Sequence, residues 1–119
     1  MRILVCGDRN WVDKLLIKSV LRQLLSKNSI DYIIEGEARG ADSLARECAE
    51  ELGIKVLKFP ADWKKYGKAA GPIRNQQMLK EGKPDLVLAF HDNLQNSKGT
   101  ANMIKISKKA GIETEVYHH

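Results

Sequence analysis

The chain has 119 residues, of which 43% are hydrophobic and 29% are charged, a composition typical of one compact globular domain. It contains only three prolines and no low-complexity segment, which argues against extended disorder, and none of its apolar runs approaches the length of a membrane span. We therefore expect a cytoplasmic protein with a single domain over residues 1–119 and no contact with a membrane.

The formal net charge of +5 raises the question of nucleic-acid binding. The lysines, however, are scattered over several predicted helices, which is typical of solvated helix faces. An anionic small molecule would suit this charge equally well, so nucleic acid is not the expected partner. Cys6 and Cys48 are predicted to be buried hydrophobic residues, and no cluster of cysteines and histidines has the spacing of a metal site.

Hydrophobic patterning predicts strands that alternate with helices along the whole chain. Apolar runs predict strands at residues 2–6, 31–35, 55–59 and 85–90, and the alternating residues 112–117 suit an edge strand. Apolar residues at helical spacing predict helices at 13–27, 41–52 and 99–110. Pro72 is expected as the first residue of a further helix that runs to about residue 81.

Strands and helices in this order indicate βαβ units with right-handed crossovers. We therefore predict an α/β fold: a Rossmann-like, doubly wound parallel sheet of five strands in the order 3-2-1-4-5, with helices on both faces. Ligands of such sheets bind at the carboxyl ends of the strands, where the strand order reverses. In this chain that point lies between the first and the fourth strands.

The segment Gly36–Asp42 joins the second predicted strand to the most regular helix and contains two glycines, Arg39 and Asp42. Glycines allow backbone N–H groups to approach an anion closely, and the helix N-terminus lies behind them. The alternative is an ordinary tight turn in which Asp42 only caps the helix.

The predicted topology brings further polar loops to the same edge of the sheet. Arg9, Arg39 and Arg74 lie in three of these segments, and Lys98 precedes Gly99 and Thr100 at the start of the last helix. Guanidinium groups, free N–H groups of a helix and a threonine hydroxyl suit a phosphate or another planar anion. Neither a Walker A loop nor the glycine pattern of dinucleotide-binding proteins is present.

Two tryptophans and one histidine in these loops each allow two interpretations. Trp63 either anchors the segment 61–71 in the core, the commoner role of a large aromatic residue, or offers a stacking surface for a base. Trp11 either packs on the first helix or contacts a ligand, and His91 is either a general acid or a loop residue without a role in catalysis. Because the segment 61–71 lacks an apolar period and contains two glycines, we expect a lid that becomes ordered with ligand.

Five segments that span nearly the whole chain carry a family resemblance: Gly7-Asp8-Arg9-Asn10-Trp11, Gly36-Glu37-Ala38-Arg39-Gly40-Ala41-Asp42, Pro60-Ala61-Asp62-Trp63, Gly67-Lys68-Ala69-Ala70-Gly71-Pro72-Ile73-Arg74-Asn75 and Gly99-Thr100-Ala101. The chain resembles the SLOG superfamily, which unites the DNA-processing Smf/DprA proteins with the Lonely-guy phosphoribohydrolases. It is most similar to small stand-alone YspA-type, YpsA-related members. The resemblance implies a Rossmann-like domain that binds a nucleotide or nucleotide-derived ligand at the strand ends.

From the loops and the resemblance together, we expect ligand contacts from a set of residues that follow the predicted strands or begin the predicted helices. They are Gly7, Asp8, Arg9, Trp11, Gly36, Arg39, Gly40, Asp42, Trp63, Arg74, Asn75, Lys98, Gly99 and Thr100.

The Lonely-guy enzymes cleave the N-glycosidic bond of nucleoside monophosphates with the glutamate of a Gly-Gly-x-Gly-Thr-x-x-Glu motif. Gly99 and Thr100 match this motif, but Ser97 and Lys98 replace the paired glycines and Met103 replaces the glutamate. The stand-alone members also often have a second glycine where this chain has Glu37. These departures leave phosphate binding in place and remove the known catalytic group.

We therefore expect a protein that binds a nucleotide-derived small molecule as a sensor or sequestering module, that needs no cofactor or metal ion, and that could form a homo-oligomer. The alternative is an N-glycosidase or phosphoribohydrolase acting on nucleoside monophosphates or NAD- and ADP-ribose-type ligands, with Glu35, Glu37 or Asp42 as its catalytic carboxylate. A weaker alternative is single-strand nucleic-acid binding, by analogy with the DNA-processing branch. His118 and His119 are assigned no function.

Overall fold

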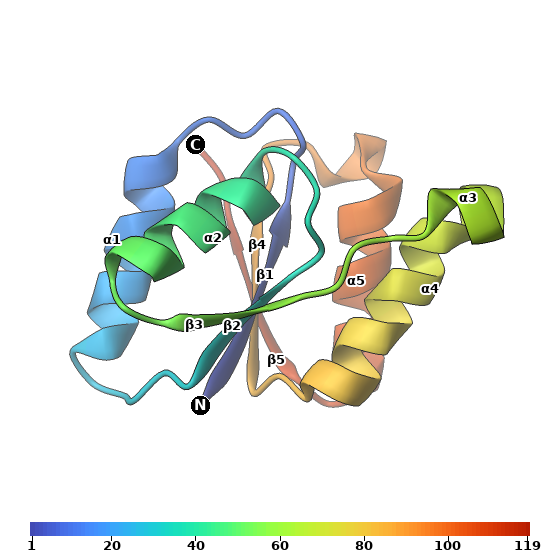
Figure 1. Cartoon of the computed structure of the whole chain (residues 1–119). Coiled ribbons are helices and arrows are strands. Elements are labelled where there is room, and N and C mark those ends of the chain that lie inside the picture. Colours follow the sequence, from blue (N-terminus) through green and yellow to red (C-terminus); the bar gives the residue numbers. More distant parts are fainter.

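The computed structural model describes all residues from Met1 to His119 and contains a sheet of five parallel strands. The strands are β1 (Arg2–Gly7), β2 (Tyr32–Glu35), β3 (Lys55–Lys58), β4 (Leu86–Phe90) and β5 (Glu113–Tyr117), in the spatial order β3-β2-β1-β4-β5 (Figure 1). This order confirms the predicted α/β fold with strand order 3-2-1-4-5. Every residue of the interior strand β4 is buried, as expected for a strand with neighbours on both sides and helices on both faces.

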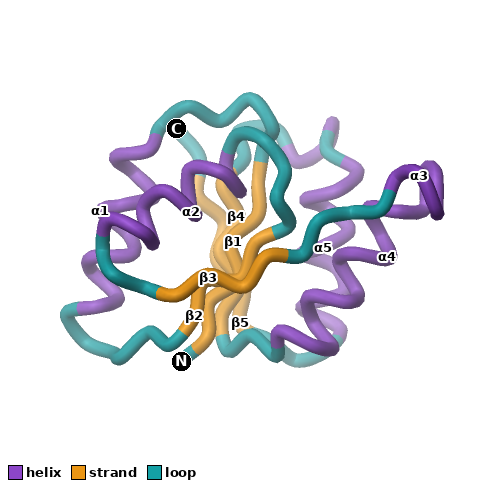
Figure 2. Tube along the Cα trace, viewed as in Figure 1, coloured by secondary structure: helices purple, strands orange, loops and turns teal.

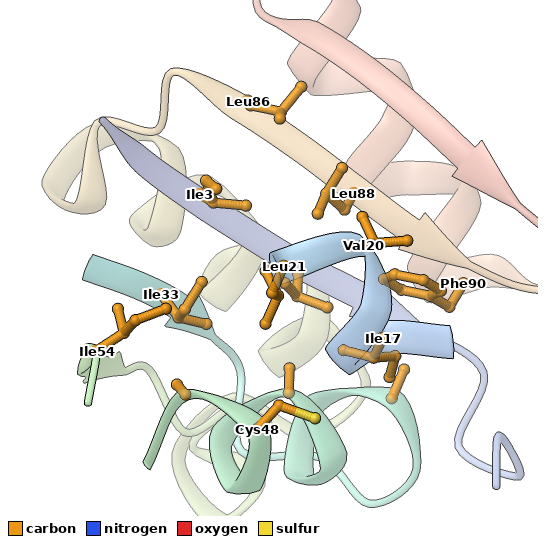
Figure 3. Packing of buried hydrophobic residues seen from close by; sticks show 14 of the residues in the cluster. Ile3, Ile17, Val20, Leu21, Ile33, Cys48, Ile54, Leu86, Leu88 and Phe90 are labelled. Carbon is orange, nitrogen blue, oxygen red and sulfur yellow. The ribbon is translucent and has the colours of Figure 1, made fainter. Parts of the chain in front are cut away.

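Helices cover both faces of the sheet (Figure 2). On one face lie α1 (Lys14–Leu25) and α2 (Ala41–Glu51), and on the other lie α4 (Ala70–Gln77) and α5 (Lys98–Lys109). Because successive side chains of a strand point to opposite faces, β1 contributes Ile3 and Val5 to the core under α1 and α2 (Figure 3) and Leu4 and Cys6 to the core under α4 and α5. No helix is both long and apolar enough to span a lipid bilayer.

The segment between β3 and β4 differs from the prediction. It forms α3 (Trp63–Tyr66), the 3-10 turn η1 (Gly67–Ala69), α4 and a closing π-helical turn, η2 (Met78–Gly82). The fourth helix thus begins at Ala70, two residues before the predicted start at Pro72. A proline is tolerated as the third residue because the first N–H groups of a helix have no partner within it.

The loop after β1 is fixed between the end of β4 and the start of α2. The N–H of Asp8 donates to the carbonyl of Phe90 at 2.9 Å, and the N–H of Ala41 donates to the carbonyl of Asp8 at 3.1 Å. This packing requires glycine at position 40, where φ is +77° and a Cβ would collide with the backbone carbonyls of Asp8 and Arg9. The loop after β1 and the turn before α2 therefore meet backbone to backbone.

Substitution of Gly40 by alanine should lower the free energy of unfolding more than the same substitution at Gly111. Both glycines have a φ of +77°, but a Cβ on Gly111 would meet nothing within 4 Å. The positive φ costs each variant ~1–2 kcal/mol. At position 40 the ψ of −125°, in a region almost confined to glycine, and the collision should together add ~1–3 kcal/mol. Urea unfolding of the two variants measures the difference. Equal losses would contradict the close packing of the loop after β1 against α2.

Candidate functional site

A cleft of about 430 Å³ opens at the carboxyl ends of β1 and β4, the position at which the strand order reverses. Its walls come from five segments that are distant in sequence: the loop after β1, the turn before α2, the helix α4, the loop after β4 and the start of α5. The lining residues that carry polar or backbone chemistry are Gly7, Asp8, Arg9, Asn10, Ala38, Arg39, Asp42, Arg74, Asn75, His91, Asn96, Ser97, Lys98, Gly99 and Thr100.

Cationic side chains outnumber carboxyl groups in this cleft. Arg9, Arg39, Arg74 and Lys98 line it together with two carboxyl groups, those of Asp8 and Asp42. The four cations come from four different segments, so the fold brings them together rather than any local basic run. Such a lining attracts an anion, and the guanidinium groups can each form paired hydrogen bonds with a phosphate or carboxylate.

Arg74 is the most firmly held of these cations. Its Nη1 donates to the carbonyl of Gly36 at 2.6 Å, and its Nε donates to Oδ1 of Asn75 at 3.0 Å. A Cβ on Gly36 would collide with the guanidinium group, so glycine at this position leaves room for Arg74. Burial lowers the pKa of Arg74, but an arginine in a protein stays charged. The cleft thus has one cation whose geometry is set before any ligand arrives.

Asn75 connects α4 to the beginning of α5. Its Nδ2 donates to the carbonyl of Gly99 at 3.2 Å and to Oδ1 of Asn102 at 3.0 Å, and its Oδ1 accepts from Arg74. The side chain is almost completely buried. Asn75, expected as a ligand contact, therefore uses its polar atoms within the protein and positions Arg74 and α5.

The first turn of α5 faces the cleft. Ser97 is its N-cap residue, and the Ser97 Oγ accepts a hydrogen bond from the N–H of Thr100 at 3.1 Å. The N–H groups of Lys98 and Gly99, the first two residues of the helix, have no acceptor within it. Ser97, which stands where the Lonely-guy motif has a glycine, is therefore a helix cap that the motif did not reveal. The signal that could have identified the cap was present, since serine directly before an apolar-periodic segment is a preferred N-cap.

Three N–H groups of the turn Gly36–Asp42 donate to carboxyl groups of neighbouring residues. The N–H groups of Gly36 and Ala38 donate to Oδ2 of Asp42 at 3.2 and 3.3 Å, and the N–H of Glu37 donates to the carboxyl of Glu35 at 2.9 Å. These groups are not available to an anion, so the expectation that they receive one does not hold. Asp42 does not cap α2 either, because Gly40 is its N-cap residue and the Asp42 carboxyl closes the turn instead.

The three candidate catalytic carboxyl groups have different surroundings. Glu35 is 0% exposed and does not line the cleft, and burial together with the neighbouring Glu37 raises its pKa to about 9. Glu37 forms an ion pair with Arg46 at 3.0 Å, and its pKa is lowered by hydrogen bonds from Glu35 and Arg46. Only Asp42 lines the cleft, and burial raises its pKa to about 6.

The backbone of Glu37 explains one departure from the family pattern. Its φ is +57°, a left-handed conformation that glycine adopts more readily than a residue with a side chain. The glycine that similar stand-alone proteins often have at this position therefore suits the same turn. In this chain the side chain at this position forms the ion pair with Arg46.

Trp11 and Trp63 have opposite roles. Trp11 is 4% exposed, packs beside Phe90 in the core under α1 and donates from Nε1 to the carbonyl of Asp13 at 3.0 Å. Trp11 does not line the cleft, so its inclusion among the ligand contacts is not supported. Trp63 is 50% exposed, which overturns the core-anchor interpretation, and the guanidinium carbon of Arg9 lies 5.9 Å from the centroid of its ring.

His91 directly follows β4 and lines the cleft in a mostly buried position. Its Nδ1 accepts a hydrogen bond from the N–H of Asn93 at 2.9 Å, which leaves the Nε2 to carry the proton when the ring is neutral. Nε2 lies 4.0 Å from Oδ2 of Asp8, which belongs to the loop after β1. His91 is therefore placed to donate toward the cleft or toward Asp8.

Comparisons with known proteins give a family model, a relative and a solved structure that match this chain. A family model described as the YspA, cpYpsA-related SLOG family (YAcAr) matches residues 1–66. The Gene 61 protein of Mycobacterium phage D29 is 34% identical over 117 residues, which cover 93% of this chain and 91% of the phage protein. The solved structure of UDP-GlcNAc 2-epimerase from Methanocaldococcus jannaschii matches 99% of this chain at 22% identity with a TM-score of 0.49, and the match spans 31% of the epimerase.

Replacing Asp42 by asparagine should change how stability depends on pH. The pKa of Asp42 is about 6 in the folded protein and ~3.9 in an unfolded chain, so wild-type stability falls as the pH rises through this range. Asparagine stays neutral, and its amide oxygen can still accept from the turn. Relative to wild type, Asp42→Asn should gain ~2–3 kcal/mol in unfolding free energy between pH 4 and pH 7.

Urea unfolding at the two pH values measures this gain. Asp42→Ala is the matched control, because it removes the charge and also the acceptor for the N–H groups of Gly36 and Ala38. The alanine variant should be less stable than the asparagine variant at both pH values. An asparagine variant that follows the wild type at both pH values would show that Asp42 ionises without cost in the fold.

Proposed function

Because the chain belongs to the YspA, cpYpsA-related SLOG family, we propose that it binds a nucleotide or nucleotide-derived small molecule in the cleft between β1 and β4. Its role would be that of a sensor or a sequestering module. The observation that supports this proposal most directly is that Arg9, Arg39, Arg74 and Lys98 line the same cleft as the first turn of α5. Side chains of this kind around a helix N-terminus are the surroundings in which proteins bind phosphate groups.

In this proposal the phosphate lies at the start of α5. The N–H groups of Lys98 and Gly99 point out of the helix end, where the helix dipole favours negative charge. Gly99 has no side chain to keep a ligand away from the backbone, and a Cβ there would itself meet open space. Thr100 and Lys98 line the same part of the cleft, so a hydroxyl and an ammonium group accompany the backbone donors.

The arginines would contribute unequally to affinity. The Arg74 guanidinium is fixed by Gly36 and Asn75, so it loses little conformational entropy when a ligand binds. Arg9 and Arg39 are exposed and must be ordered by the ligand, which costs part of the energy that they supply. Their contribution should also weaken with salt, because exposed charges are screened.

N-glycosidic hydrolysis is the second candidate, and one observation favours it. Asp42 is a carboxyl group in the cleft whose pKa of about 6 lies near the value that suits a general acid or base. Two observations oppose it. Oδ2 of Asp42 accepts hydrogen bonds from the N–H groups of Gly36 and Ala38. Met103, which stands where the Lonely-guy enzymes have their catalytic glutamate, is 1% exposed and cannot ionise. Binding without hydrolysis is therefore the better-supported proposal.

Arg39→Ala should weaken the binding of ADP by ~1.5–3 kcal/mol, the scale of a charge-assisted hydrogen bond. Isothermal titration at low and moderate salt measures the effect. Arg22→Ala is the matched control, because Arg22 is exposed on α1 and its loss changes the net charge equally. If Arg39→Ala binds ADP as tightly as the control and keeps its melting temperature, Arg39 belongs to the solvated surface.

AMP and NAD should remain intact after long incubation with the protein. The loss of a positioned general acid or base typically costs ~10²–10⁴-fold in rate, and here methionine occupies the position of that group. Chromatography of the incubated nucleotides measures the release of free base. Robust release that Asp42→Asn abolishes would establish the enzyme instead. Met103→Glu tests whether a carboxylate at the family's position restores hydrolysis.

A further inference from the structure

The cleft continues past its arginines into a second cavity of about 560 Å³. Arg9, Arg39 and Arg74 line both spaces, so the three guanidinium groups stand at the boundary between them. The far side of the second cavity is formed by Pro60, Ala61 and Trp63, at the end of the loop after β3. The first space is thus bounded by the start of α5, and the second by an aromatic residue and two small apolar ones.

We propose that the second cavity is a subsite for a planar aromatic group, and that the ligand is a two-ended molecule whose internal phosphate groups lie between the shared arginines and the first turn of α5. The inference rests on the proposed function, since it specifies the class of nucleotide-derived molecule that the cleft binds. The class is a nucleotide whose phosphate carries a second organic group, such as a dinucleotide joined through a diphosphate.

Trp63 provides the surface for the aromatic group. The side chain is half exposed, and it lies at the start of α3, which stands away from the sheet on the outer side of α4 (Figure 1). The side chain lines the second cavity, and even a Cβ added at Gly71 in α4 would lie 3.6 Å from its Cη2 without a collision. The half-exposed ring is therefore accessible to a group bound in that cavity.

Arg9 is the only cation of the boundary that lies near this ring. Its guanidinium carbon is 5.9 Å from the ring centroid, at the outer limit of a cation–π contact. A base that stacked on Trp63 would replace this weak contact with a base–aromatic stack. Arg9 would then be free to turn toward the linking phosphate, beside Arg39 and Arg74.

The position of the arginines between two cavities argues against a ligand with a terminal phosphate. A mononucleotide that placed its phosphate between the arginines and the start of α5 and its base against Trp63 would leave the rest of the first cavity, beside Asp8, Asn10 and His91, unfilled. A phosphate diester or diphosphate diester places its charge in the middle of the molecule and an organic group on each side. The one carboxylate in the second cavity, that of Glu37, is already paired with Arg46 at 3.0 Å, so it would repel such a ligand little.

A pair of probes separates two-ended binding from attraction to charge. ADP and P1,P2-di(adenosine-5′) diphosphate share the diphosphate, but the second carries fewer negative charges and one more adenosine. The wild-type protein should bind the diadenosine compound about tenfold more tightly than ADP or better, within the range expected for one stacked base. Trp63→Ala should abolish this preference, because the diadenosine compound then has only one adenosine subsite, as ADP does.

Tyr66→Ala is the matched control, because Tyr66 is an exposed aromatic residue of the same short helix that does not line the second cavity. This variant should keep the preference. Trp63 is half exposed, so its replacement should leave the melting temperature near that of wild type. Protection of residues 61–71 from hydrogen exchange by the diadenosine compound, but not by ADP, would support the same subsite.

Two results would overturn the inference in different ways. Equal affinity for both probes in the wild type, or a preference that survives Trp63→Ala, would exclude the aromatic subsite while leaving the proposed function intact if Arg39→Ala still weakens both probes. Failure of both probes to bind at millimolar concentration would overturn the proposed function together with the subsite.

Discussion

The contact between the Arg74 guanidinium and the backbone of Gly36 links the two layers of helices at the site. Gly36 begins the turn that leads to α2 on one face, and Arg74 belongs to α4 on the other. Asn75 extends the connection to the first turn of α5 through the carbonyl of Gly99 and the side chain of Asn102. One row of hydrogen bonds therefore crosses the carboxyl edge of the sheet and sets the distance between the walls of the cleft.

Burial makes this row rigid. Gly36 and Asn75 are buried. If Arg74 moved, the carbonyl of Gly36 and Oδ1 of Asn75 would lose their hydrogen-bond donor, and water could not replace it. The same low-dielectric surroundings raise the pKa of Asp42, which lies near enough for the Arg74 charge to offset part of that rise. Fixed donors of this kind favour a ligand of one shape, because the protein does not reorganise to receive it.

Periodicity in the sequence predicted the strands, the helices and their order. It did not predict the directions of individual polar and aromatic side chains in the loops. Continuous apolar runs such as Leu86–Phe90 have one stable place in a parallel sheet, and this is why the strand order followed from the pattern. The internal use of the N–H groups of Gly36 and Ala38 depends on where Asp42 turns, which spacing does not determine. The sequence left Trp63 open between a core anchor and an exposed stacking surface, because spacing does not determine where a loop side chain points.

The buried carboxyl of Glu35 gives the folded chain a property that its formal charge conceals. At neutral pH this group keeps its proton in the folded state, because burial and Glu37 raise its pKa to about 9, whereas an exposed glutamate in an unfolded chain titrates near ~4.3. Unfolding at neutral pH therefore releases a proton from this position, and stability falls as the pH rises between these values. The heat of unfolding then includes the heat with which the buffer takes up that proton, so calorimetry in phosphate and in Tris would report different enthalpies for the same transition.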